Sequence, residues 1–190
     1  MALNLKQWGA IFIAGLFAMS IVGFIGVGNS NPVTGAATST SLDYNGYTFT
    51  KNGNYWQTSV NNIDFLFTSP PSALEVFEIP EDSSEIINFN KIYLAYNPEQ
   101  SLDLSIIRFH AVSFFSNFNI RSFEACIEEE GCPNIPIVDC TEDHAIIFIQ
   151  DNDITEVTTK DNCIEVHSAN IETMQRQLER IFYQSLGIMQ

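Results

Sequence analysis

The chain has 190 residues, enough for one domain of typical size and a short additional segment, but too few for two full domains. Hydrophobic residues make up 45% and charged residues 16%, which excludes a disordered, collagen-like or coiled-coil protein as a whole. Only 7 Lys and Arg residues follow Lys6, against 23 Asp and Glu residues, so this part has a formal net charge of −16. Because phosphate binding requires basic clusters, nucleic acid is not an expected partner.

The stretch from Trp8 to Gly28 contains 21 residues without a charge. As a helix it would be about 31 Å long, which matches the hydrocarbon thickness of a bilayer. We expect residues 1–28 to be a transmembrane helix that is retained as an anchor, since a cleaved signal peptide has a shorter apolar run. Lys6, the only charge before this stretch, favours a cytoplasmic N-terminus and places the rest outside the cytoplasm. The rest would be membrane-anchored, or secreted if the segment is cleaved.

Residues 29–41, NSNPVTGAATSTS, are small and polar and show no periodic apolar pattern. This composition is typical of a flexible linker. We therefore expect residues 42–190 to form one extracytoplasmic domain.

Three strands are predicted at the start of this domain. Apolar and polar residues alternate over residues 47–50 and 55–60, and the intervening Asn52-Gly53 is a hairpin turn signal. Residues 63–67 alternate again and are followed by Pro70 and Pro71, so the three strands should form a β-meander. Ser72 and Glu75 have the spacing of a capping box, which predicts a short helix ending near residue 77.

Two acidic segments are candidates for calcium binding. Residues 78–85, EIPEDSSE, are predicted to be a solvated loop, and residues 150–153, QDND, an Asx-rich turn. Clustered carboxylates suit hard cations, but neither segment has the ligand spacing of a calcium loop. We favour the loop and the turn without a metal.

The second half of the domain predicts a mixed sheet. Residues 91–96 are apolar on both faces, as in a central strand, and Ser101 can cap a helix with an apolar stripe through Phe118. A strand over residues 121–125 follows closely, so a crossover to a parallel neighbour is expected. Three further strands are predicted over residues 145–149, 154–159 and 163–167, the last two returning antiparallel.

The C-terminal helix is the most strongly indicated element. Asn170 can cap it, Glu172 favours its N-terminal end, and Gly187 marks its end. Its apolar stripe, which we expect to pack in the core, comprises Ile171, Met174, Leu178, Ile181, Phe182 and Leu186, and its opposite side carries Arg176, Gln177, Glu179 and Arg180. The predicted fold is α+β: an N-terminal transmembrane helix, a β-meander, and a mixed β-sheet packed with a crossover helix and a C-terminal amphipathic helix.

The four cysteines lie in the last third of the chain, at Cys126, Cys132, Cys140 and Cys163. Thiols outside the cytoplasm tend to oxidise, so an even number indicates two disulfides. Three pairings can be formed. We favour Cys126–Cys132, which closes a short acidic loop, and Cys140–Cys163, since each of these two borders an apolar run.

Zinc binding is a competing interpretation of the same residues. The pairs Cys140-x3-His144 and Cys163-x3-His167 supply four ligands, but residues four apart on a strand are about 13 Å apart, too far for one ion. Disulfides are therefore preferred to zinc. A redox enzyme is disfavoured as well, because the chain has no Cys-x-x-Cys motif.

Familiar catalytic motifs are absent from the sequence: there is no nucleophile elbow, phosphate-binding loop, dinucleotide fingerprint or His-Glu-x-x-His. His110 lies in an apolar helix and is expected to be a core or boundary residue. His144 and His167 have no nearby nucleophile in a known pattern. A pair of carboxylates for glycoside hydrolysis could still occur among the 23 acids. We assign no catalytic, cofactor-binding or metal residues.

The runs YNGYTFTKNGNYWQTSVNN, SPPSALE and NCIEVHSANIETMQRQLERIFYQSLGIM resemble small single-pass membrane proteins of archaea with reduced genomes. The resemblance covers most of the outer domain. It implies an envelope location and the use of disulfides, and it carries no activity and no functional residue.

The sequence favours a membrane-tethered extracytoplasmic domain that acts through protein contacts or as a structural component at the cell envelope, more in keeping with a non-enzyme than an enzyme. Two alternatives remain open. One is an extracytoplasmic hydrolase or metal-dependent enzyme that combines acids with His144 or His167. The other is a pilin-like surface subunit, which lacks the expected basic-Gly processing signal here.

Overall fold

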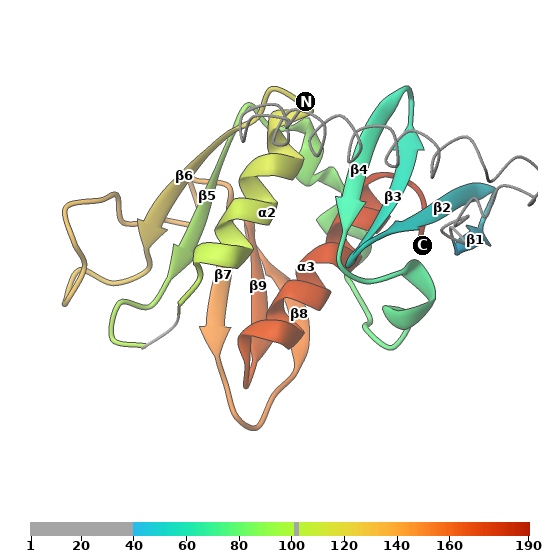
Figure 1. The fold of residues 1–190 in the computed structure, drawn as a ribbon. Helices are drawn as coiled ribbons and strands as arrows, with labels where there is room; N and C mark the ends of the chain where they lie inside the picture. The colour runs from blue at the N-terminus through green and yellow to red at the C-terminus, as the bar shows by residue number, and fades with distance from the viewer. Residues whose placement is uncertain (1–39, 101–102) are drawn as a thin grey trace, which may run out of the picture. The chain divides into compact units, whose positions relative to one another are not determined.

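A computed structural model describes residues 40–100 and 103–190 (Figure 1). The predicted membrane anchor, residues 1–28, and nearly all of the predicted linker lie outside these ranges, as does the predicted helix cap Ser101. Within the described ranges, none of the helices has the length and apolar character needed to cross a bilayer.

The first sheet is an antiparallel meander with the order β1-β2-β3-β4. Its strands are β1 (Ser41–Tyr44), β2 (Tyr47–Asn52), β3 (Tyr55–Val60) and β4 (Ile63–Phe67). The last three confirm the predicted meander. Strand β1 was not predicted, and it begins one residue inside the stretch expected to be linker. Two-residue turns connect the pairs β1–β2 and β3–β4, with Asn45, Gly46, Asn61 and Asn62 at positive φ as type I′ turns require.

The second sheet is mixed, with the order β6-β5-β7-β9-β8. Its strands are β5 (Lys91–Tyr96), β6 (Arg121–Cys126), β7 (Ala145–Gln150), β8 (Glu156–Lys160) and β9 (Cys163–Ser168). Helix α2 (Ser105–Ser116) links β5 to β6, which run parallel as predicted. The hairpin β8–β9 is antiparallel as predicted, but β9 turns back to pair in parallel with β7. The largely buried β9 thereby takes an interior position, and the polar β8 takes the sheet edge.

Two predictions for the segment between the sheets were wrong. The expected helix over residues 72–77 is only a 3₁₀ turn, η1 (Pro71–Ala73), with no side-chain cap. Glu75 interacts with Tyr44 instead of closing a capping box. Burial raises the pKa of Tyr44, and the hydrogen bond that its hydroxyl donates to Glu75 raises this pKa further. The expected solvated loop over residues 78–85 is largely a 3₁₀ helix, η2 (Glu81–Asn88). It is folded because Ile86 is buried in the core, and Gln184 holds its start by donating to the carbonyl of Pro80 at 2.9 Å.

Helix α3 (Ile171–Ser185) begins and ends as the sequence indicates. Asn170 accepts a hydrogen bond from the backbone N–H of Thr173 at 2.9 Å, and Gly187 follows the helix at φ +71°. The predicted polar side is wrong in one respect, because Gln177, Glu179 and Arg180 are buried. They are buried because α3 lies between the two sheets and contacts both (Figure 1).

The meander is attached to α3 by polar and aromatic contacts. The carboxylate of Glu179, which is only 2% exposed, accepts hydrogen bonds from the backbone N–H groups of Thr68 and Ser69 at 2.6 and 3.0 Å. Tyr183 packs on Phe67, with 4.1 Å between ring centroids, and donates to the carbonyl of Ser69 at 2.8 Å. Burial raises the pKa of Tyr183 well above its ordinary value, so its hydroxyl remains a donor.

Removing the Glu179 carboxylate should weaken the whole domain. Glu179→Ala leaves two backbone N–H groups without an acceptor, and we expect it to lower the free energy of unfolding by about 3 kcal/mol. Urea unfolding of the full chain measures the loss. The control is Glu172→Ala on the exposed first turn of the same helix, which should cost at most about 0.5 kcal/mol. Equal losses for the two variants would contradict the role assigned to Glu179.

Candidate functional site

The mixed sheet has a face of small side chains, covered by the connection between β6 and β7. Ala95, Ala125 and Ala145 form this face together with Ile147 and Cys163. Because these side chains are small, the connection over residues 127–144 can pack closely on them, and Ile127, Val138 and Cys140 do so. Backbone bonds between Cys126 and residues Pro136 and Val138, both 2.9 Å, hold the connection beside the end of β6.

Two disulfides secure this connection, and they are the pairs favoured from the sequence. Cys126–Cys132 closes a short loop at its start, and Cys140–Cys163 ties its far end to the first residue of β9. Within the described residues no cysteine is free. Disulfides of this kind are typical of an oxidising, extracytoplasmic environment.

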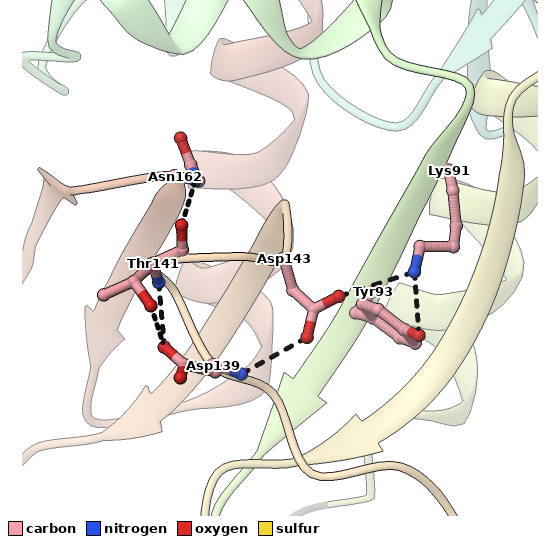
Figure 2. Close-up of polar contacts among 6 residues, drawn as sticks. All are labelled: Lys91, Tyr93, Asp139, Thr141, Asp143 and Asn162. Carbon is pink, nitrogen blue, oxygen red and sulfur yellow. Dashed lines mark hydrogen bonds and ion pairs between the residues drawn. The ribbon is translucent and has the colours of Figure 1, made fainter.

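Polar contacts link the end of the connection between β6 and β7 to the start of β5 and to Asn162 (Figure 2). Lys91 at the start of β5 donates to Tyr93 at 3.0 Å and forms an ion pair with Asp143 at 3.4 Å. Asp139 accepts from both the backbone N–H and the hydroxyl of Thr141, at 2.9 and 2.7 Å, which lowers the pKa of that carboxyl. The bond to Tyr93, together with Asp143, raises the pKa of Lys91. These groups satisfy one another, so the cluster fixes the loop and does not offer a vacant site.

Neither of the two histidines considered for chemistry belongs to a group of metal-ligating side chains among the described residues, and His144 lines a small pocket of about 160 Å³ with Asp82, Glu85 and Asp161. His144 stacks on Phe89, with ring centroids 3.6 Å apart, and His167 lies 3.4 Å from Glu165 on the same strand. Cys140 and Cys163, their partners in the zinc hypothesis, are bonded to each other.

Neither acidic segment forms a calcium cage. The carboxylate of Asp151 accepts from the backbone N–H groups of Asp153 and Ile154, which is the Asx turn predicted for residues 150–153. In the ranges that the structure covers, no group of three or more His, Cys, Asp or Glu side chains is arranged to hold a metal ion.

A groove runs between β4 and α2, and we call it the β4 groove. It has a volume of about 390 Å³, within the range of ligand-binding pockets. Its walls are strongly aromatic: Tyr55, Phe65, Phe67, Phe109, Phe114 and Phe182 line it together with Asp64, Leu66, His110 and Glu179. Its floor is firm because Phe114 stacks on Phe182, with ring centroids 3.8 Å apart and an interplanar angle of 6°.

Helix α2 exposes an apolar row beside this groove. Ile106, Phe109 and Val112, which we call the α2 patch, are three residues apart and therefore share one face of the helix. Phe109 is 72% exposed, although the helix also buries Ile107, Ala111, Phe114 and Phe115 on its other side. Leu66 and Tyr55 add two further exposed apolar side chains from the meander. The patch and the groove together are the candidate functional site.

The sequence contained a signal for this site, but the prediction considered only the one apolar stripe of this helix that faces the core. Apolar residues lie on both sides of the helix over residues 105–116, which is more than one core-facing stripe requires. His110 was predicted to be a core or boundary residue, and it is half-buried at the groove, with its ring 6.4 Å from that of Tyr55.

Comparison with known protein families, curated proteins and solved structures found no match for this chain.

The two disulfides should differ in their contribution to stability. In the chain-entropy model, closing 23 residues stabilises by roughly 3 kcal/mol and closing 6 residues by roughly 2 kcal/mol. We therefore expect the double variant Cys140→Ala/Cys163→Ala to unfold at lower urea concentration than Cys126→Ala/Cys132→Ala. Urea unfolding of both variants and the oxidised parent measures the order, and the reverse order would contradict it.

Proposed function

We propose that this chain is a membrane-tethered extracytoplasmic domain that binds another protein of the cell envelope through the α2 patch and the β4 groove. The observation that carries the proposal is the exposed apolar row of Ile106, Phe109 and Val112. Large apolar side chains gathered on a surface mark interaction sites, because exposing them to water is unfavourable.

The tether is inferred from the sequence and the outer location from the disulfides. The 21 uncharged residues from Trp8 to Gly28 have the length of a bilayer span, and both cysteine pairs require an oxidising compartment to persist. The resemblance to small single-pass archaeal membrane proteins agrees with such a location.

The charge of the domain favours a partner of particular chemistry. With 7 basic and 23 acidic residues after Lys6, the domain attracts basic surfaces and repels acidic ones, including other copies of itself. The apolar row would provide the contact area, and the overall charge would speed encounter with a basic partner.

Photo-crosslinking tests the binding surface. We expect benzoylphenylalanine in place of Phe109, in the full chain added to detergent extracts of the native envelope, to capture one protein. The double change Ile106→Ser/Val112→Ser should reduce this product at least fivefold, because it removes the adjoining apolar contacts. The control places benzoylphenylalanine at Val76, which is 75% exposed but is not among the residues that line the groove. The same products from both positions, or none from Phe109, would refute the proposal.

Fractionation tests the tether. We expect the full chain to stay in the membrane pellet after alkaline carbonate extraction, and protease added to intact cells to degrade residues 42–190. A variant that lacks residues 1–28 should appear in the soluble fraction. A full-length native chain found in the soluble fraction would show that the apolar segment is not a tether.

A further inference from the structure

Strand β4 has a free edge among the residues that the structure describes. It ends the meander, and its register with β3 pairs Val60 with Ile63 across the turn. In a two-residue hairpin these flanking residues form a hydrogen-bonded pair, and such pairs alternate along the ladder. Asp64 and Leu66 therefore direct their backbone N–H and C=O groups away from β3. Within residues 40–100 and 103–190, no backbone group of a turn, loop or helix end bonds to either residue.

The β4 groove lies along this edge. Phe65 and Phe67 point to the core side of β4 and Leu66 to the outer side, yet all three line the groove. Residues from both sides of a strand can border one space only where that space meets the strand's edge. The other wall is α2, and Figure 1 shows β4 between β3 and this helix. The groove thus brings aromatic side chains together with backbone groups that have no neighbouring strand in the described part of the chain.

The edge carries little of the protection that natural sheets use against unwanted pairing. Strand β4 has no proline and a single charge, Asp64, whose carboxylate accepts a hydrogen bond from Ser59. Among the described residues that line the groove, the ionisable side chains are Tyr55, Asp64, His110 and Glu179, and none is Lys or Arg. A second copy, which carries the same large negative charge, would be repelled, and a basic segment would be attracted.

We propose that an extended segment of the partner protein adds to β4 as a fifth strand, with apolar and basic residues in alternation. Its backbone pairs with the outward N–H and C=O groups of Asp64 and Leu66. Its apolar side chains enter the groove against Phe109, and its basic side chains lie near Asp64. This mode of binding, in which main-chain bonds give affinity and alternate side chains give specificity, rests on the proposed function.

A synthetic probe tests the mode directly. The probe is a fluorescent octapeptide of alternating Phe and Lys, titrated against the purified full chain in nanodiscs. Successive N–H groups of a strand point to opposite edges, so N-methylation at every Lys or at every Phe blocks one edge at a time. We expect one N-methylated form to bind at least tenfold more weakly and the other to bind like the parent. Equal binding of both forms, or no binding of the parent, overturns strand addition.

Variants of the chain give an independent measurement. Leu66→Pro removes an outward N–H and no bond to β3, so it should weaken probe binding about tenfold. The control is Asp43→Pro on β1, the other end strand of the meander among the described residues. The backbone of Asp43 likewise faces away from its neighbour strand. It should bind the probe within twofold of the parent. Equal effects of the two substitutions overturn the proposal.

Amide hydrogen exchange tests strand addition in the unmodified chain, so it does not depend on the folding of Leu66→Pro. In the unmodified chain, probe binding should slow exchange of the Asp64 and Leu66 amides at least tenfold and leave those of Phe65 and Phe67 unchanged. Unchanged exchange at Asp64 and Leu66 overturns strand addition.

The crosslink at position 109 distinguishes failure of strand addition from failure of the proposed function. If the folded Leu66→Pro variant still captures the envelope protein at full yield, the proposed binding surface is supported and strand addition is refuted. If position 109 captures no protein even in the chain without Leu66→Pro, the proposed function itself is refuted. Loss of capture in Leu66→Pro but not in Asp43→Pro supports both.

Discussion

The carboxylate of Glu179 joins the two sheets of this domain. It lies on α3, which also packs against η2, β9 and α2, and it accepts hydrogen bonds from the backbone at the end of β4. A buried carboxylate is tolerated only when donors surround it, and Thr68 and Ser69 supply three. The end of β4 is therefore fixed relative to α3, and through α3 relative to α2. Glu179 and Phe182 of α3 also line the groove between β4 and α2.

The opposite face of the mixed sheet is organised by a different constraint. The connection over residues 127–144 contains little regular structure and covers a row of alanines, which bury little apolar surface. Such a cover contributes a small hydrophobic stabilisation, and the two disulfides supplement it by restricting the unfolded chain. The bonds among Lys91, Asp139 and Asp143 satisfy the polar groups left at its end.

The two faces of the mixed sheet differ in what they leave exposed. The disulfide-secured face is closed by side chains that satisfy one another, whereas the side with α2 leaves apolar residues and backbone groups exposed. A domain with a net charge of −16 after Lys6 can expose such a surface without self-association, because copies repel each other.

Local patterns in the sequence determined the elements whose signals lie within a few residues. Asn52-Gly53 indicated the hairpin of β2 and β3, Asn170 and Gly187 bounded the last helix, and the positions of the four cysteines favoured the two disulfides that form. Tertiary structure alone decided the parallel pairing of β9 with β7, the burial of Glu179 and the folding of residues 81–88 into a helix. Each of these features depends on which distant part of the chain packs against the segment. The pattern of apolar and polar residues within a strand or helix does not specify that neighbour. The groove belongs to this second class, since a free strand edge is defined only when the order of the strands is known.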